Sequence, residues 1–239
     1  MLKNLVIVFQ IVLLSDITFA ETVNFKKSIS IEYFLQAKIS GLNLNGKGYI
    51  NWKQNNNNKY ELSFITKVPL FGTLLSEKSI GIFNQNGLNP EIFSSKKVNK
   101  KEKIIKFNRK KKILTFNDNT PGYVLNGDEQ DHISALWQIS FLLNKNINSL
   151  LKNKEQTLNV ISRKGVEQWI FLIHKKENIK TNLGVCECLH LEYVPSEKSD
   201  SPKVNIWLSP NINWLPVKLI FSKKNGNKII QSIKNLNYL

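Results

Sequence analysis

The chain has 239 residues, with 34 lysines and arginines against 18 aspartates and glutamates, so its formal net charge is +16. A chain of this length can bury a sizeable hydrophobic core, and it suits one large domain better than two small domains. Much of the positive excess is lysine, accompanied by abundant asparagine. The charge therefore reflects either a basic surface that binds anions or the composition of the source genome.

The first twenty residues predict a signal peptide. Lys3 precedes an apolar run that extends from Leu5 to Leu14 with one interruption, and small residues approach Ala20. The run is too short to span a bilayer of roughly 30 Å as a helix, so we expect cleavage after Ala20 rather than anchoring. No cysteine follows the run, which argues against a lipoprotein, and no later apolar stretch approaches spanning length.

Export would place the remaining chain, residues 21–239, in the periplasm as a single soluble domain. A periplasmic location excludes nucleic acid as the partner of the positive charge. The anionic partners that remain are lipid headgroups, lipopolysaccharide and acidic glycans, and the sequence identifies no protein partner.

The segment after the signal peptide alternates apolar and polar residues from Ile29 to Ile39, with one exception at Phe34. A period of two predicts a half-buried strand, and this one exceeds the usual strand length, so we expect it to bend. Alternation resumes from Leu42 to Trp52, where Gly46 and Gly48 share a face and favour bending. Further strand-like segments follow, separated by turn residues: 60–64, then 82–83 and 92–93 around Asn86-Gly87 and Asn89-Pro90, then 103–107, 112–116, 166–173, 184–194, 203–208, 214–221 and 228–233.

One helix is predicted between the two strand-rich parts of the chain. From Asp131 to Asn144 the apolar residues follow helical spacing, with Ser140 as the one gap in the apolar stripe. Neither an internal repeat nor a linker divides the chain. Many closely spaced strands with one central helix predict a mainly β fold: a single curved antiparallel sheet, or a partly open barrel, with the α-helix packed against it.

The first candidate site lies at the start of this helix, where Asp128, Glu129, Asp131 and His132 precede an apolar run. Carboxylates at a helix start complement the helix dipole and accept bonds from its unpaired N–H groups. Neighbouring positions do not share a helix face, and the chain contains no HExxH or GxSxG motif. The pattern therefore favours a helix cap over a hydrolytic or metal site, and we predict no catalytic residue.

The second candidate is a metal site. Cys186, Cys188 and His190 alternate along a strand-like segment, and a hairpin closed near Asn182 would bring His174 opposite His190. The spacing matches no recognised zinc pattern, and isolated cysteines in strands are usually packing residues. A disulfide between the two cysteines is awkward because a flat strand sets their Cα atoms at the outer limit for bridging. We therefore predict no metal and no other cofactor.

Two further segments have more than one interpretation. The basic run from Ser94 to Phe116 is either the solvent face of a hairpin, where edge lysines discourage aggregation, or a surface that binds lipid headgroups. In the segment from Val204 to Phe221, Trp207 and Trp214 are of a type that more often packs than stacks on a ligand. Pro216 lacks a ladder donor, so we expect its strand to lie at a sheet edge or to be irregular there.

A series of landmarks runs in order along nearly all of the chain after the signal peptide. They are Tyr33, then Ser79-Ile80-Gly81 and Gly87-Leu88-Asn89-Pro90, then Gln130, Asp131 and Ser134 at the helix start, then Ile206-Trp207-Leu208 and Trp214-Leu215-Pro216-Val217. The series resembles a bacterial exported family known as domain of unknown function 3108. The resemblance implies a periplasmic, largely antiparallel β protein without an established catalytic activity. It marks as family-motif positions, without assigning a role, Gln130, Asp131, Ser134, Trp207, Trp214 and Pro216.

These features predict a noncatalytic envelope protein whose curved sheet shelters an apolar ligand, such as an acyl chain, beside a basic rim open to anionic headgroups. The alternative is a structural or interaction protein that helps to assemble envelope polymers and binds no ligand. A third hypothesis, a hydrolase that uses Asp128, Asp131 or His132, would require these side chains to converge on an open cleft. The residues that would bind a ligand are not identified by the sequence.

Overall fold

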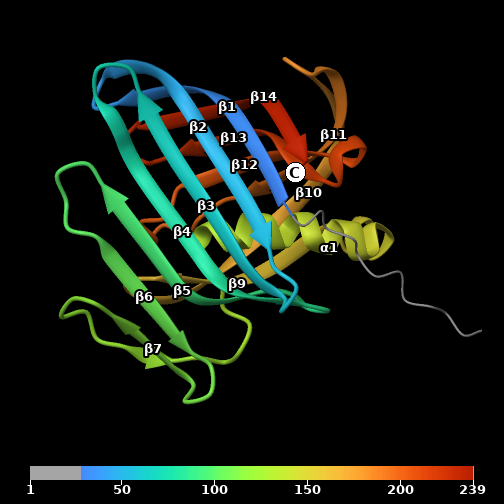
Figure 1. Cartoon of the computed structure of the whole chain (residues 1–239). Coiled ribbons are helices and arrows are strands. Elements are labelled where there is room, and N and C mark those ends of the chain that lie inside the picture. The colour runs from blue at the N-terminus through green and yellow to red at the C-terminus, as the bar shows by residue number, and fades with distance from the viewer. Residues whose placement is uncertain (1–27, 239) are drawn as a thin grey trace, which may run out of the picture.

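A computed structural model describes residues 28–238, so the predicted signal peptide and its cleavage after Ala20 lie outside the described part. Within it, fourteen strands form one sheet in which all neighbouring strands are antiparallel, together with one α-helix (Figure 1). The elements are β1 (Ser28–Ile39), β2 (Leu42–Gln54), β3 (Lys59–Val68), β4 (Gly72–Asn84), β5 (Gly87–Lys97), β6 (Lys103–Asn108), β7 (Ile113–Phe116), β8 (Tyr123–Val124), α1 (His132–Asn153), β9 (Glu155–Ser162), β10 (Gly165–Thr181), β11 (Gly184–Tyr193), β12 (Lys203–Ser209), the short 3₁₀ helix η1 (Pro210–Ile212), β13 (Leu215–Ser222) and β14 (Lys228–Tyr238). The predicted mainly β fold with one packed helix is confirmed.

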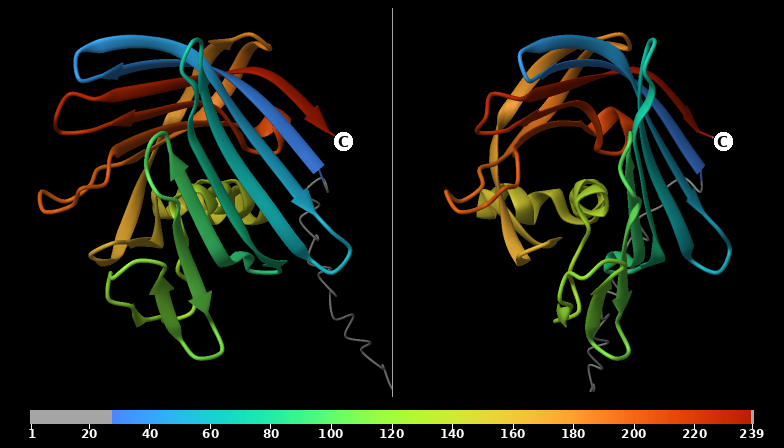
Figure 2. Two further views of the ribbon diagram at one scale, coloured as in Figure 1. Left: turned by 60° about the vertical axis from the view of Figure 1, so that its left-hand side comes forward. Right: turned by 90° about the vertical axis from the view of Figure 1, so that its left-hand side faces the viewer.

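The sheet curls around α1 without closing on itself. Its strand order is β8-β7-β6-β5-β4-β3-β2-β1-β14-β13-β12-β11-β10-β9, so β8 and β9 form the two edges. Figure 2 shows the sheet arching over the helix, which lies inside the curve. Between residues 28 and 238, no helix combines the length and the apolar character that crossing a membrane requires.

The core lies between α1 and the concave face of the sheet. Trp52 of β2 stacks on Tyr60 of β3 at 5.3 Å between ring centroids and on Trp137 of α1 at 5.9 Å. Phe83 of β4 makes edge-to-face contacts with Trp52 and with Phe141 of α1. Because each well-placed aromatic pair contributes about 0.5–1.5 kcal/mol beyond its buried area, this chain of rings fixes the helix against the first half of the sheet.

The helix is longer than predicted. It continues from the expected end at Asn144 to Asn153, across a kink at Asn146 whose backbone (φ −160°, ψ 75°) is not helical. The Asn146 side chain accepts a bond from the backbone N–H of Ser149 and so caps the second part of the helix. Beyond the kink, Ile147 packs against the core and Leu150 is buried, so the second part of the helix also contributes to the core.

The hairpin expected around residues 82–93 has its turn earlier than predicted. The turn falls at residues 85–86, and Asn89-Pro90 lies inside β5 at a register shift opposite Gly81. A Cβ on Gly81 would stand 2.1 Å from the carbonyl oxygen of Asn89, so only glycine permits the two strands to approach this closely. The irregularity places Pro90 where the sheet does not need its missing N–H.

Two further strand features differ from the prediction, and the prediction for the strand of Pro216 is confirmed in one of its two forms. The edge strands β8 and β9 are not recognised in the sequence, and β10 extends to Thr181 rather than ending at residue 173. The strand that holds Pro216 lies inside the sheet between β12 and β14, not at an edge. The expected irregularity is present, because the β12–β13 register shifts between Trp207 and Leu208, next to the position of Pro216.

Candidate functional site at the start of the helix

The helix start is built around the buried carboxylate of Asp131. Its Oδ1 accepts bonds from the backbone N–H groups of Ile133 (3.1 Å) and Ser134 (2.9 Å), so Asp131 is the N-cap of α1. The Ser134 hydroxyl donates back to the Asp131 carbonyl at 3.0 Å. The capping interpretation is confirmed, because these bonds satisfy helix donors that would otherwise have no partner.

The second oxygen of Asp131 ties the helix to the sheet. Oδ2 accepts a bond of 2.6 Å from the hydroxyl of Ser79 in β4, and that hydroxyl lies 3.0 Å from the hydroxyl of Tyr60 in β3. All three side chains are buried. Burial raises the pKa of Asp131 above its usual value, although the bonds from Ser79 and from the helix N–H groups oppose the shift, and burial also raises the pKa of Tyr60.

His132 points to a different partner, as expected for neighbouring helix positions. Its Nε2 lies 2.9 Å from Oε2 of Glu77 in β4, and Glu77 also accepts a bond from the Ser95 hydroxyl of β5. The imidazole packs edge-on against the ring of Phe93. Burial disfavours both charged forms, but their mutual attraction outweighs it, so the pKa of His132 is raised and the pKa of Glu77 is lowered.

Glu129 organises the loop before the helix. Its carboxylate accepts bonds from the backbone N–H groups of Asn126 and Gly127 and pairs with the Arg109 guanidinium at 2.8 Å. Arg109 also donates to the carbonyl of Glu129 at 2.6 Å. Burial raises the pKa of Glu129, but these donors and the guanidinium outweigh it, and the net pKa is lowered. A hollow of about 370 Å³ lies beside the pair, and its lining includes Arg109, Lys112 and Glu91.

Gln130 connects β5 and β9, two strands that are not neighbours in the sheet. Its backbone forms a parallel bridge with Val160 of the edge strand β9, through bonds with Asn159 and Ile161. Its side-chain Nε2 donates to the carbonyl of Leu88 in β5 at 2.7 Å. One residue thus links β5 to β9, between which the sheet is not continuous.

Asp128 also connects the segment before the helix to the edge strand β9. Both of its carboxylate oxygens accept bonds from the Asn159 amide of β9, at 3.0 and 2.9 Å. Asp128, Glu129, Asp131 and His132 are therefore brought near one another, yet each is directed to a separate partner, and they do not converge on a shared open cleft. Together, the hydrogen bonds and ion pairs of residues 128–132 fix the helix start to β3, β4, β5 and β9. We call this set of contacts the latch.

Sequence reasoning found the helix-side residues of this latch and missed its sheet-side partners. Ser79 and Glu77 occupy inward positions of β4, where a core strand normally presents apolar residues. Polar residues at inward-facing positions of a strand are the signal in the sequence that could have identified these two residues. Their pairing with Asp131 and His132 spans 52 and 55 residues of sequence, a separation that no local pattern resolves.

In the second candidate site the two histidines lie side by side, but the side chains around them do not form a metal-binding group. The rings of His174 and His190 stack at 4.8 Å, as the hairpin predicted. Each imidazole has its own acidic neighbour: His174 lies 3.4 Å from Glu192, and His190 lies 3.2 Å from Glu177. Within residues 28–238, no cluster of three or more histidine, cysteine, aspartate or glutamate side chains is arranged to hold a metal ion.

The two cysteines are free thiols. Cys188 is buried and Cys186 is partly exposed. Burial raises the pKa of Cys188 to about 12, so the side chain stays a neutral thiol and not the thiolate that binds metals. This position fits the packing role that is usual for a cysteine in a strand.

The tryptophan and proline positions near the end of the chain lie in and beside β12 and β13. Trp207 is buried in β12 and stacks on His190, with 4.4 Å between centroids and 3° between planes. Trp214 is partly exposed and immediately precedes β13, at a positive φ of 54°. The carbonyl of Pro216 accepts a 2.7 Å bond from the buried Tyr33 hydroxyl of β1. Family-motif positions at both ends of the chain thus meet across the sheet.

An open half-barrel with a helix latched inside it is the class of structure that these observations define. The chain belongs to the family described as "Protein of unknown function (DUF3108)", whose pattern matches residues 29–231. No curated protein matches the chain.

Among solved structures, the chain is similar to a β-barrel-like protein of the domain of unknown function DUF1849 from Brucella abortus. The TM-score is 0.58 at 10% identity, over 90% of this chain and 98% of the other, so the likeness concerns the fold alone. A DUF1329 family protein from Desulfovibrio piger matches with a TM-score of 0.33 at 9% identity, over 90% of this chain and 87% of the other. MucB matches with a TM-score of 0.34 at 7% identity, over 89% of this chain and 53% of the other. At these two scores the likeness supports no argument about function.

Proposed function

We propose that the chain is a noncatalytic protein of the bacterial periplasm that binds an apolar ligand, such as an acyl chain, on the concave face of its sheet. The N-terminal sequence supports export. The observation that carries the proposal is the part of the concave face that the helix leaves uncovered.

The helix packs mainly against β9, β5, β4, β13 and β3. Toward the turns β1–β2 and β13–β14, the inward rows of β2, β13 and β14 continue beyond this contact. There Leu44, Phe221 and Ile229 are inward-facing and only partly buried, and Phe221 lies directly opposite Ile229. The inward positions Gly46 and Gly48 add no side chain to this surface. A concave apolar surface with partly exposed side chains is the kind of site that an apolar ligand occupies.

Variants of neighbouring positions test the proposal on one pair of strands. Phe221→Glu with Ile229→Glu introduces charges on the concave face, and Ile220→Glu with Ile230→Glu introduces the same charges on the convex face. The readout is binding of a fluorescent fatty acid to the purified protein, with circular dichroism as the check of folding. Loss of binding only in the concave variant supports the proposal, whereas no binding by the wild-type protein, or equal loss in both folded variants, refutes it.

A structural or interaction protein without a ligand is the second candidate function. It is favoured by the closely packed aromatic core, in which Trp52 stacks on both Tyr60 and Trp137 between the sheet and the helix. A wild-type protein that takes up no fatty acid would favour this candidate. A hydrolytic role has less support, because Asp131 and its Ser79 partner are fully buried.

A further inference from the structure

Four hairpin turns meet at one end of the curved sheet. They join β1 to β2, β3 to β4, β5 to β6 and β13 to β14, and Figure 2 (right) shows them around the open end of the half-barrel. The β1–β2 and β13–β14 turns also touch, since the backbone N–H of Ser40 donates to the Asn227 side chain at 2.9 Å. We call residues 38–42, 67–73, 96–103 and 223–228 the hairpin rim.

The hairpin rim is strongly and uniformly basic. Its only acidic residue is Glu102, and its lysines are Lys38, Lys67, Lys96, Lys97, Lys100, Lys101, Lys103, Lys223, Lys224 and Lys228. All of these lysines are exposed, and none forms an ion pair with an acidic side chain of residues 28–238. The β11–β12 loop lies at the same end, where Lys224 donates to backbone carbonyls of residues 196 and 197, and Asp200 offsets part of the charge of Lys223 and Lys224. Ten lysines against these few carboxylates still leave a positive excess at this end, which can attract an anionic partner.

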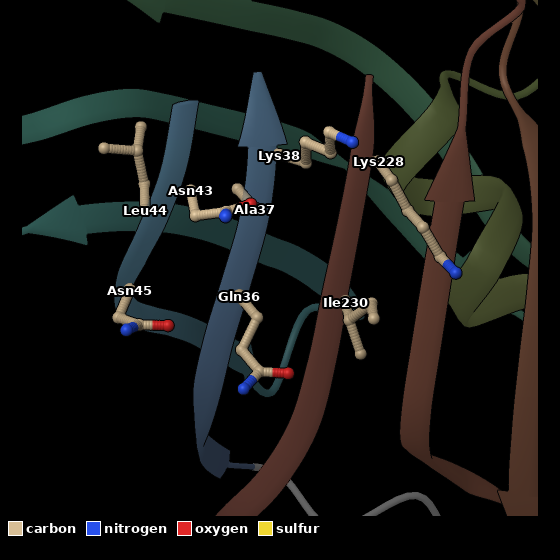
Figure 3. Close-up of a pocket in the computed structure, with 8 residues that line it drawn as sticks. All are labelled: Gln36, Ala37, Lys38, Asn43, Leu44, Asn45, Lys228 and Ile230. Atoms are coloured by element: carbon tan, nitrogen blue, oxygen red, sulfur yellow. The ribbon is translucent and has the colours of Figure 1, made fainter. Parts of the chain in front are cut away.

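Two of the lysines lie on neighbouring strands at paired positions. Lys38 of β1 and Lys228 of β14 are partners in the strand register, where like charges are destabilising. Both line a hollow of about 250 Å³ on β1, β2 and β14, shown in Figure 3 together with Gln36, Asn43 and Asn45. The two positive side chains at the border of this hollow would attract an anion to it.

The tips of the same turns carry exposed apolar side chains. Leu70 is fully exposed (103%), Leu42 is 67% exposed, Phe71 is 64% exposed and Val98 is 47% exposed. Leu70 adopts a positive φ of 66°, a conformation that favours glycine or asparagine in a turn. A leucine held there in full contact with solvent contributes nothing to the core, so its side chain is suited to a contact outside the protein.

The central hairpins look different at the opposite end of the sheet. The β2–β3 turn is formed by Asn55 to Asn58, and the β4–β5 turn by Gln85 and Asn86, with neither lysine nor large apolar residues. The turns that join β2 to β3 and β4 to β5 are thus polar and uncharged, whereas the turns of the hairpin rim at the other end are basic and carry apolar side chains. Lysine remains at the opposite end in the β6–β7 turn, where Lys110 and Lys111 serve as matched controls.

We propose that the hairpin rim docks the protein onto the surface of an anionic phospholipid bilayer. The apolar tips enter the headgroup region while the surrounding lysines contact lipid phosphates, the combination of forces that holds proteins on membrane surfaces. Separate apolar tips on a basic ring suit a bilayer, which accepts each tip independently. This inference goes beyond the proposed function, because docking requires no ligand on the concave face.

The test is sedimentation of the protein purified after export, without the predicted signal peptide, with vesicles of phosphatidylcholine, with or without phosphatidylglycerol. We expect binding to the anionic vesicles only, weakening as salt is added. Lys100→Gln with Lys101→Gln should lower the partition coefficient roughly 30-fold, since two lysines near the surface are lost. Lys110→Gln with Lys111→Gln removes the same charge at the opposite end and should leave binding within about twofold of wild type.

The apolar tips are tested separately. Leu70→Ser with Phe71→Ser should weaken binding by about tenfold or more without unfolding the protein, because both side chains are exposed. The control Leu183→Ser removes an exposed apolar side chain at the β10–β11 turn, at the opposite end, and should not change binding. All variants share the same N-terminal segment, so differences between them report on the hairpin rim.

Absence of binding to the anionic vesicles overturns the docking proposal, as does equal binding to neutral vesicles or an equal loss in the rim and control variants. The two proposals fail independently. A protein that binds fatty acid but no vesicles refutes docking alone, and a protein that docks through the rim but takes up no fatty acid refutes ligand binding alone.

Discussion

Replacing Asp131 by alanine removes three hydrogen bonds at once. The N–H groups of Ile133 and Ser134 lose their cap, and the buried hydroxyl of Ser79 loses its acceptor and keeps only Tyr60. A lost cap costs about 1 kcal/mol, and a buried polar group left without its partner costs about 1–3 kcal/mol. We therefore expect Asp131→Ala to lower the free energy of unfolding by about 2–4 kcal/mol.

Asparagine at position 131 is the matched comparison. It keeps an oxygen for the helix N–H groups, and its amide can donate to Ser79 if the Ser79 hydroxyl turns toward Tyr60. It also removes a buried carboxylate whose raised pKa means that the charged form is disfavoured by burial. We expect Asp131→Asn to lose less than about 1.5 kcal/mol.

Urea unfolding followed by circular dichroism measures both variants at neutral pH. A loss below about 0.5 kcal/mol in Asp131→Ala, or equal losses in the two variants, would refute the latch at the helix start. The raised pKa also sets the sign of a pH effect. Because the folded pKa is the higher one, the part of the stability that depends on protonation of Asp131 is fully present below the unfolded pKa of about 3.8 and is lost as pH rises through the folded value. The hydrogen bonds that Asp131 accepts remain at neutral pH, and Asp131→Asn should abolish the pH dependence alone.

Three further predictions concern other parts of the fold. The pKa of Glu77 is lowered from 4.5 and that of His132 is raised from 6.5. Their pair should therefore stabilise the fold most between pH 4.5 and 6.5, and this stability should be lost as the pH falls below or rises above that window. In thermal melts, Glu77→Gln should not show either of these losses. Gly87→Ala should lower the thermal midpoint, because a φ of +96° strains alanine and a Cβ would displace Gln138 Oε1 from its bond with the Leu88 N–H; a midpoint equal to wild type would contradict this. Cys188 should resist alkylation at pH 8 in the native protein while the other thiol reacts, and equal labelling would contradict the burial of Cys188.

The long strands and the helix start could be predicted because their signals are local. Alternation in residues 29–39 corresponds directly to the buried and exposed positions of β1, and Phe34, the exception in the pattern, is exposed. Asp131 before an apolar helical stripe is a recognisable cap. In each case the residue types within one segment determine its structure.

The missed elements depend on contacts with distant residues. Strand β9 contains only a few apolar residues, with Leu158, Val160 and Ile161 buried, and its edge is partly paired by Gln130. The last part of α1 is not evident from the sequence because residues 144–149 are mostly polar and the backbone of Asn146 is not helical, although Leu150 still packs in the core. Neither feature follows from propensity in a short window, since tertiary packing decides both.

The candidate site was only half predictable for the same reason. The role of Gln130 depends on the path of the chain across the opening between β5 and β9, and the role of Ser79 depends on the register of β3, β4 and the helix start. A sequence pattern marks such residues as unusual, but only the fold shows which partner each one meets.

Native mass spectrometry of the protein purified gently after export, followed by extraction and identification of whatever denaturation releases, tests the central claim most directly. The account predicts a mass above that of the polypeptide by one apolar ligand, which the concave-face variant Phe221→Glu with Ile229→Glu lacks. A mass equal to that of the polypeptide alone, with no uptake of added fatty acid or phospholipid, would contradict it.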